Sequence, residues 1–170
     1  MTTSDKGITL IKHFEGLHDG DLNEIGLQPK LCPAGVWTVG YGRALKDNKG
    51  RFVRGDVSVE KLTQMFPQFM CITEKQAEEY LIEDLRRFEW VVNNKVYTDL
   101  QQYEFDALVS HTYNTGGSST LFSLVNKRDS KRIEKWMKTT YITANGVYLR
   151  GLFNRRVAEW VLFSENRLTL

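Results

Sequence analysis

The sequence predicts an α+β fold that is mainly α-helical, with a small β-containing N-terminal lobe and a larger helical C-terminal lobe joined by a long helix. Residues 19 to 58 are rich in Gly, Asp and Asn and contain short alternating segments, which is typical of a small, irregular antiparallel sheet. Most of the remaining chain carries apolar residues at helical spacing. With 170 residues the chain can bury a sizeable core as one domain.

The first helix is predicted to begin at Ser4 or Asp5, because either side chain can cap it. Its apolar residues recur at three-residue steps, namely Ile8, Ile11, Phe14 and Leu17. This spacing places Glu15 in the last turn, where its carboxylate meets whatever follows the helix.

The long connecting helix is predicted over about residues 73–94. Thr73-Glu74-Lys75-Gln76 fits a capping box, and apolar residues then follow at helical spacing as far as Val92. Asp84 falls on this apolar stripe, where an unpaired carboxylate would be costly. We therefore expect Asp84 to have a buried or half-buried partner.

The C-terminal lobe is predicted over about residues 95–170 as a set of shorter helices. The first follows Thr98 or Asp99 and stops at Asn114-Thr115-Gly116-Gly117. Further helices are expected after Ser119, Ser130 and Arg150, with Asn145-Gly146 turning the chain before the last one. Together with an N-terminal lobe over roughly 14–72 and the first helix, they make residues 1–170 a single domain.

Composition limits the chemistry and the location of the protein. Cys32 and Cys71 fit neither a disulfide framework nor a zinc site, so we expect free thiols, no metal and no cofactor. The N-terminus has no apolar leader, and no stretch approaches the roughly 18 apolar residues of a membrane span. We expect a protein made in the cytoplasm that does not insert stably into membranes.

Basic residues concentrate in the C-terminal third. Residues 1–125 hold 13 Lys and Arg against 17 Asp and Glu, whereas residues 126–170 hold 10 against 4. This split suits an anionic polymer such as peptidoglycan or teichoic acid, although a solvated helix face is an equally good explanation. Nucleic acid is not expected as a partner, because the basic residues form no dense run and no reading motif accompanies them.

The residues with the clearest chemical meaning are Glu15, Cys32 and Thr38. Cys32 and Thr38 lie in the run Cys-Pro-Ala-Gly-Val-Trp-Thr-Val-Gly-Tyr-Gly, which reads as a Gly-rich hairpin. A carboxylate at a helix end, followed by a hairpin with a thiol and a hydroxyl, is a plausible set for protonating a glycosidic bond and placing a water. The less favoured alternative is that Cys32 is an ordinary half-buried thiol and Thr38 an ordinary strand residue.

This arrangement resembles the phage-type lysozymes, the endolysin family that includes the lysozymes of T-even bacteriophages. The resemblance spans nearly the whole chain in the right order. The matching segments are Phe14-Glu15-Gly16-Leu17, the Gly-rich hairpin, Ile72-Thr73, residues 105–110, Tyr113-Asn114-Thr115-Gly116 and residues 151–159.

The resemblance implies a lysozyme-like fold and a muramidase that hydrolyses the β-1,4 bond between N-acetylmuramic acid and N-acetylglucosamine of bacterial peptidoglycan, with inversion. Glu15 then becomes the general acid and Arg155 an arginine that contacts it. Cys32 takes the second catalytic position, and Thr38 holds the attacking water. Tyr113 and Asn114 align with residues near the bound sugar, although Tyr113 would also fit a core.

Arg156 is expected to form a structural pair with Glu159 or to belong to the basic surface. Trp136 and Trp160 lie on helical apolar stripes and are expected to pack rather than to bind sugar.

Two departures from the family pattern affect the site. The gap between Glu15 and Cys32 is longer than usual, and the insertion at 19–31 adds Asp19, Asp21 and Glu24, any of which could replace Cys32 as the second group. Arg43 stands where many members have a histidine that pairs with the connecting helix. We therefore predict an Arg43–Asp84 salt bridge.

Two other functions remain open. A lytic transglycosylase would use a hydroxyl of the sugar in place of water, and a non-catalytic peptidoglycan-binding protein would keep the fold without turnover. For the muramidase we expect a monomer that stays in the host bacterial cytoplasm until a membrane pore releases it to the cell wall.

Overall fold

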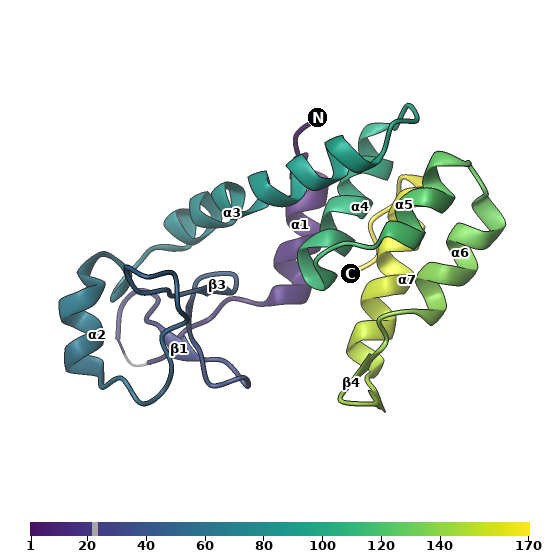
Figure 1. The fold of residues 1–170 in the computed structure, drawn as a ribbon. Helices are drawn as coiled ribbons and strands as arrows, with labels where there is room; N and C mark the ends of the chain where they lie inside the picture. Colours follow the sequence, from purple (N-terminus) through teal and green to yellow (C-terminus); the bar gives the residue numbers. More distant parts are fainter. Residues whose placement is uncertain (22–23) are drawn as a thin grey trace. The chain divides into compact units, whose positions relative to one another are not determined.

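The computed structural model describes residues 1–21 and 24–170 and contains seven α-helices and short antiparallel strands within that part of the chain (Figure 1). It divides into two compact units. The helical unit comprises Met1–Phe14 and Leu85–Leu170, and the sheet unit comprises Glu15–Asp84. The elements, in chain order, are α1 (Asp5–Glu15), β1 (Lys30–Leu31), β2 (Trp37–Val39), β3 (Arg43–Ala44), α2 (Val59–Met65), the 3-10 helix η1 (Pro67–Phe69), α3 (Glu74–Lys95), α4 (Gln102–Thr115), α5 (Ser119–Asn126), α6 (Ser130–Thr139), β4 (Thr143–Ala144), β5 (Val147–Tyr148) and α7 (Arg150–Glu165).

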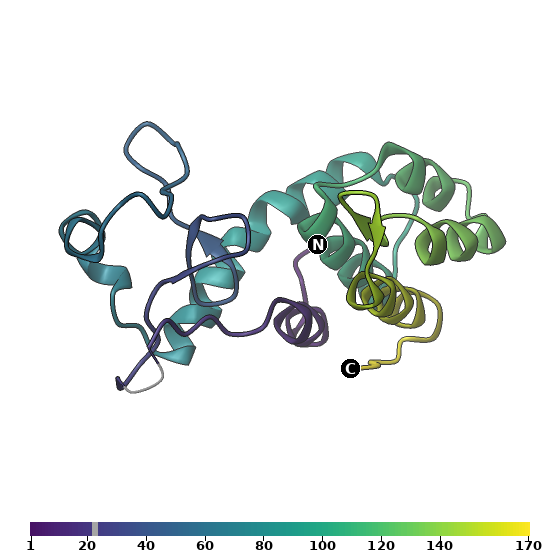
Figure 2. The same cartoon turned by 90° about the horizontal axis from the view of Figure 1, so that it is seen from below.

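The sheet unit is built on the predicted small antiparallel sheet, with the strand order β1-β2-β3. Thr38 of the central strand lies opposite Lys30 on one side and Ala44 on the other. After β3 the chain forms a loop whose base is closed by the Val53 amide donating to the Leu45 carbonyl at 3.0 Å, and this loop stands out in Figure 2. Beside this closure Phe52 pairs with Lys46, and Arg54 pairs with Val36, as isolated antiparallel bridges.

Helices α2 and η1, which close the sheet unit before α3, were not predicted from the sequence. Ser58 caps α2, since its hydroxyl oxygen accepts a hydrogen bond from the Lys61 amide at 3.3 Å. Leu62 is the one fully buried residue of this helix. A helix of seven residues with a single core residue shows too little periodicity to be recognised from the sequence.

The connecting helix α3 confirms the predicted capping box and ends at Lys95. The Gln76 amide donates to the Thr73 hydroxyl at 3.1 Å, and the Thr73 amide donates to the Gln76 side chain at 2.9 Å. Buried apolar residues follow at helical spacing, as the stripe predicts: Ala77, Leu81, Leu85 and Val92.

In the helical unit α4 is the central element, because residues 104–112 are all buried. It packs against α7, and α6 contacts both α5 and α7. The helix begins at Gln102, a few residues later than the predicted start after Thr98 or Asp99. At the observed start the Glu104 carboxylate accepts a hydrogen bond from the Gln101 amide at 2.8 Å. It ends as predicted, since Gly116 takes the left-handed conformation at φ 83° that terminates helices.

The three C-terminal helices begin where the sequence predicts them. The Asn145-Gly146 turn is also present, with positive φ at both residues, and it joins the short strands β4 and β5, which were not predicted. None of the helices in the described part of the chain has the length and apolar composition that a bilayer span needs.

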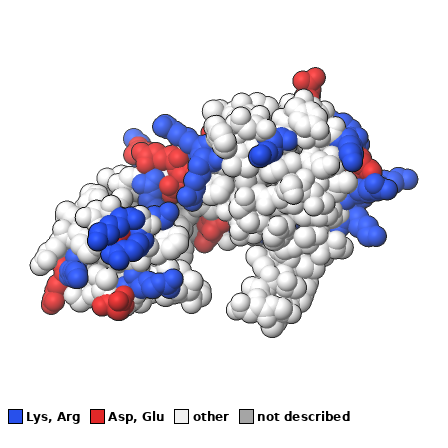
Figure 3. All heavy atoms as spheres, viewed as in Figure 1, with Lys and Arg blue, Asp and Glu red and all other residues white. Residues whose placement is uncertain are grey.

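Basic side chains gather on the surface at and around α6 (Figure 3). Lys131, Arg132 and Lys135 are exposed on this helix, while Ile133 and Met137 are buried beneath it. The hairpin of β4 and β5 is uncharged, since no Lys, Arg, Asp or Glu occurs from Thr139 to Leu149.

The predicted salt bridge between Arg43 and Asp84 is confirmed within the sheet unit. Arg43 donates through Nε and Nη2 to the two Asp84 oxygens at 3.0 and 3.2 Å. Its Nη2 also donates to the Tyr80 carbonyl at 3.0 Å and to Glu83 at 2.9 Å. Burial lowers the pKa of Arg43, but the hydrogen bonds that Arg43 donates to Asp84 and Glu83, together with the charges of these two carboxylates, have the larger effect. The pKa of Arg43 is therefore raised.

The Arg43 contacts should contribute to stability. Arg43→Ala should lower the free energy of unfolding by about 1–2 kcal/mol, because it removes charge-assisted hydrogen bonds at a partly exposed site. Urea unfolding measures the change, with Arg43→Lys as the control, which keeps the charge but not the forked geometry and should fall between the two. An unfolding free energy for Arg43→Ala equal to that of the wild type would show that the contacts add nothing.

His111 is a fully buried histidine in the core of the helical unit. Its ring lies 5.4 Å from the Trp136 ring and 5.6 Å from the Tyr141 ring, measured between centroids. Nδ1 lies 3.3 Å from the Thr115 hydroxyl, and Nε2 has no hydrogen-bond partner among the described residues. Burial, followed by the nearby Arg156 and Arg155, lowers the pKa of His111 to about 3.

His111 should make the protein sensitive to acid. The unfolded chain binds a proton at this histidine at about pH 6.5, whereas the folded protein resists it until about pH 3, so stability is lost as pH falls between these values. The His111 side chain alone should lower the free energy of unfolding by about 3 kcal/mol when the pH falls from 7 to 4.

Urea unfolding at both pH values should therefore show a smaller acid-induced loss for His111→Phe than for the wild type. His13→Phe, at an exposed position, is the control and should keep the wild-type pH dependence. Identical pH dependence in the wild type and His111→Phe would contradict the assignment.

Candidate functional site

Glu15 lies where the sequence predicts it, as the last residue of α1. Its side chain is half-buried, and Gly16 follows with a positive φ of 69°, which ends the helix. Three residues after Glu15 the His18 amide donates to the Gly40 carbonyl at 2.8 Å. Because three residues span at most about 11 Å, Glu15 stays close to the end of the central strand β2.

His18 is a site neighbour that the sequence analysis missed. Burial lowers its pKa most strongly, the Glu15 carboxylate raises it, and Lys30 lowers it, with a net lowering. The imidazole is therefore neutral at neutral pH and lies within electrostatic reach of both Glu15 and Lys30. The only signal in the sequence was its position three residues after the acid.

Thr38 is buried in β2, with 5% of its surface exposed. Its hydroxyl donates to the Lys30 carbonyl across the ladder at 2.9 Å. A hydroxyl has one proton and two lone pairs, so the oxygen can still accept a hydrogen bond. Towards a water molecule Thr38 therefore acts as an acceptor.

Cys32 follows β1 in the same hairpin as Thr38. The Cys32 amide donates to the Val36 carbonyl at 2.9 Å, and its carbonyl accepts the Gly35 amide at 2.8 Å. The thiol is half-buried and free, while Cys71, the other free cysteine, is exposed. The structure thus brings the predicted thiol and hydroxyl onto one hairpin.

The carboxylates of the 19–31 insertion differ in their surroundings. Asp19 is half-buried and its carboxylate accepts the Asp21 amide at 3.2 Å, whereas Asp21 and Glu24 are exposed. Leu22 and Asn23, which belong to the same insertion, lie outside the described residues. Asp19 therefore helps to shape the loop.

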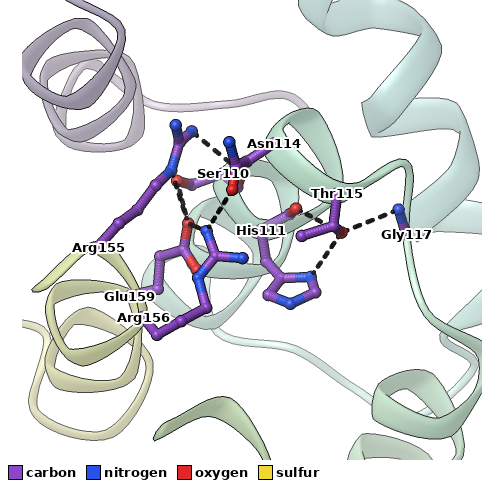
Figure 4. A network of polar contacts seen from close by, with 8 residues as sticks. All are labelled: Ser110, His111, Asn114, Thr115, Gly117, Arg155, Arg156 and Glu159. Carbon is purple, nitrogen blue, oxygen red and sulfur yellow. Dashed lines mark hydrogen bonds and ion pairs between the residues drawn. The ribbon is translucent and has the colours of Figure 1, made fainter. Parts of the chain in front are cut away.

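Arg155 belongs to a buried ion cluster of the helical unit (Figure 4). Arg155 and Arg156 donate to the same oxygen of Glu159 at 3.2 and 2.9 Å, and the Ser110 hydroxyl donates to it at 2.8 Å. All three charged side chains are almost completely enclosed. The predicted pair of Arg156 and Glu159 is confirmed.

Two guanidinium groups meet one carboxylate in this cluster. Burial raises the pKa of Glu159 by more than Arg156, Arg155 and the Ser110 hydroxyl lower it. Arg155 also lies over the Phe14 ring, 5.7 Å from its centroid. The contact expected between Arg155 and Glu15 joins residues of different units and stays a prediction.

Tyr113 and Asn114 follow the cluster at the end of α4. Asn114 is exposed, and its side-chain oxygen accepts from Arg156 at 3.0 Å, so the amide is held in place with its nitrogen available (Figure 4). Tyr113 is half-buried and packs edge-on against Phe88, with 5.0 Å between centroids. Trp136 packs against His111, and Trp160 stacks on Phe163, so both tryptophans have the packing role predicted for them.

The chain matches proteins of known family along almost its whole length. The family model described as phage lysozyme matches residues 12–159. An endolysin of Acyrthosiphon pisum secondary endosymbiont phage 1 is 33% identical, with 96% of this chain and 98% of that protein covered. An endolysin of Bacillus phage PZA is 31% identical over 96% of this chain but only 55% of its own length, so the chain spans about half of that relative.

Solved structures give the same result for the fold. The endolysin from Escherichia coli O157:H7 phage FAHEc1 superposes with a TM-score of 0.76 at 31% identity, covering 100% of this chain and 98% of that one. The muramidase domain of SpmX from Asticaccaulis excentricus gives a TM-score of 0.68 at 27% identity, covering 96% and 97%. The predicted lysozyme-like α+β fold is confirmed, and the chain belongs to the phage lysozyme family, as a glycoside hydrolase of the lysozyme type.

Proposed function

We propose that the protein is an endolysin that hydrolyses the β-1,4 bond between N-acetylmuramic acid and N-acetylglucosamine in bacterial peptidoglycan. The names of its relatives, endolysin and muramidase domain, support this substrate. The observation that carries the proposal is the position of Glu15, a half-buried carboxyl group at a helix end, next to the hairpin with Thr38 and Cys32.

In the proposed mechanism Glu15 is the general acid that protonates the glycosidic oxygen as the bond breaks. A water attacks the anomeric carbon from the opposite face, which inverts its configuration, and the proton that this water loses passes to solvent. Thr38 positions this water by accepting a hydrogen bond from it, because the Thr38 hydroxyl itself donates to the Lys30 carbonyl.

Cys32 is the proposed second group, which stabilises the positive charge developing on the sugar or polarises the water. Its place on the hairpin of Thr38 supports this assignment, since backbone hydrogen bonds hold both residues in the same hairpin. Asp21 and Glu24 are exposed, and Asp19 is engaged by the Asp21 amide, so the insertion carboxylates have weaker support.

Arg155, Tyr113 and Asn114 are proposed to assist rather than to react. Arg155 would hold Glu15, and the exposed Asn114 amide, fixed by Arg156, would hydrogen-bond the glycan. Tyr113 is assigned to glycan contact only through its exposed part, because its ring packs on Phe88. In the cell the protein would act as a monomer that reaches the wall after a membrane pore opens.

Glu15→Gln should reduce the release of glycan fragments from purified peptidoglycan by about 10²- to 10⁴-fold, the contribution typical of a general acid. Reduction of the fragments and mass spectrometry identify the new ends, which should be reducing N-acetylmuramic acid. Glu24→Gln, at an exposed carboxylate, is the matched control and should keep wild-type activity.

Different products would contradict this mechanism. Ends of the 1,6-anhydro type would identify a lytic transglycosylase, and binding by the wild type without any release would identify a peptidoglycan-binding protein.

Cys32→Ala should lower kcat by about 10- to 100-fold, as loss of one electrostatic contact to the reacting centre does. Asp21→Asn should leave kcat within about twofold, because this carboxylate is exposed to solvent and screened. Initial rates on purified peptidoglycan measure both, and thermal unfolding verifies that the variants are folded. Loss of hydrolysis in Asp21→Asn with full activity in Cys32→Ala would transfer the role to the insertion.

A further inference from the structure

The sheet unit contains a surface hollow that the proposed reaction does not use. It has a volume of about 750 Å³ and lies between the loop after β3 and helix α2. We call it the Phe52 hollow, and the residues of its lining that matter here are Arg51, Phe52, Arg54, Asp56, Lys61 and Met65.

The loop that forms one wall of the Phe52 hollow is held in one shape by Asp47. Its carboxylate accepts the amides of Lys49 and Arg51, each at 2.9 Å, and the Arg51 Nε at 2.8 Å. The backbone amide and side chain of Arg51 lower the pKa of Asp47, so the carboxylate stays charged. A preorganised wall loses little conformational entropy when it binds a ligand.

Two cations of the hollow, Arg54 and Lys61, form no ion pair within the described residues. The Arg54 guanidinium donates to the Ala34 carbonyl at 3.3 Å. The lining also contains two carboxylates: Asp47, which is paired with Arg51, and Asp56, which can balance only one of the two cations. The lining therefore has a net positive charge, and a guanidinium group matches the geometry of a carboxylate or a phosphate.

An apolar surface lies beside these cations. Phe52 is 51% exposed and Met65 is 37% exposed, although both line a concave surface. The Lys46 ammonium lies 5.0 Å from the Phe52 ring centroid, which holds the ring in the loop. A ligand that suits the hollow carries an oxyanion next to an apolar or weakly polar group.

We propose that the Phe52 hollow is a second, non-catalytic binding site that takes an oxyanion of the bacterial wall polymer. The proposal rests on the proposed function, since peptidoglycan offers carboxylates on its stem peptides and attached teichoic acid offers phosphates. Both have the chemistry that Arg54 and Lys61 recognise. A second contact on a polymeric substrate raises the effective concentration of the glycan at the catalytic residues without any new contact there.

The double variant Arg54→Gln/Lys61→Gln tests the site, because both residues are exposed and can change without disturbing the core. The matched control is Lys75→Gln/Arg86→Gln on α3, which removes the same charge, one lysine and one arginine, from exposed positions outside the hollow. Initial rates are measured on three substrates: intact walls, walls freed of phosphate by acid, and glycan strands freed of stem peptides by an amidase.

The Arg54/Lys61 variant should raise KM on intact walls by about tenfold with kcat unchanged, and the α3 control should stay within about twofold of the wild type. The treatment that abolishes this difference identifies the oxyanion: the amidase if it is a carboxylate, the acid if it is a phosphate. Equal KM values for the Arg54/Lys61 variant and the wild type on intact walls, or an equal rise in the α3 control, would overturn the proposal.

Co-sedimentation with intact walls separates this proposal from the proposed function, because it requires no turnover. If the wild type released no fragments, the muramidase assignment would fail, yet weaker sedimentation of the Arg54/Lys61 variant alone would still support the site. Equal sedimentation of all three proteins would overturn it.

Discussion

The burial of two guanidinium groups with one carboxylate between α4 and α7 constrains the whole helical unit. Removing three charges from water is costly, and the cost is offset only if their hydrogen bonds are kept in good geometry. Arg155 and Arg156 of α7 must therefore stay in register with Ser110 and Asn114 of α4. A shift of either helix would leave buried charges without their partners, so the cluster specifies how the two helices pack.

Arg43 has the corresponding role in the sheet unit, at lower burial. Its planar fork engages both oxygens of Asp84 and the Tyr80 carbonyl at once, which a lysine or a neutral histidine could not do. The hairpin with Thr38 is thereby tied to α3 through the strand next to it. Each unit thus has its own ionic tie, and in each the arginine comes from an element that carries proposed site residues or adjoins them.

Two kinds of feature were predictable from the sequence: helices long enough to show a hydrophobic period, and a charged side chain that needs a partner because it lies on an apolar stripe. The helices with clear apolar spacing lie where expected. Asp84 was expected to have a partner because a carboxylate on an apolar stripe requires one, and the resemblance to the phage-type lysozymes identified that partner as Arg43. Short elements such as α2 and the β4–β5 hairpin escaped, since two to seven residues carry little periodicity. The hydrogen bond between the His18 amide and the Gly40 carbonyl was not predicted, because its only signal in the sequence is the position of His18 three residues after Glu15. Summed charge also misleads, because the acidic total of residues 1–125 hides the cationic lining around Arg54.

Thr38 gives the strongest argument about the type of reaction. Because its hydroxyl proton is committed to the Lys30 carbonyl, it can hold a water only by accepting from it. A water that donates to Thr38 keeps its own lone pairs free, and a free lone pair on oxygen is what attack on an anomeric carbon requires. A transglycosylase, whose nucleophile is a hydroxyl of the sugar, gains nothing from such a residue. The buried hydrogen bond of one threonine thus favours hydrolysis over transglycosylation.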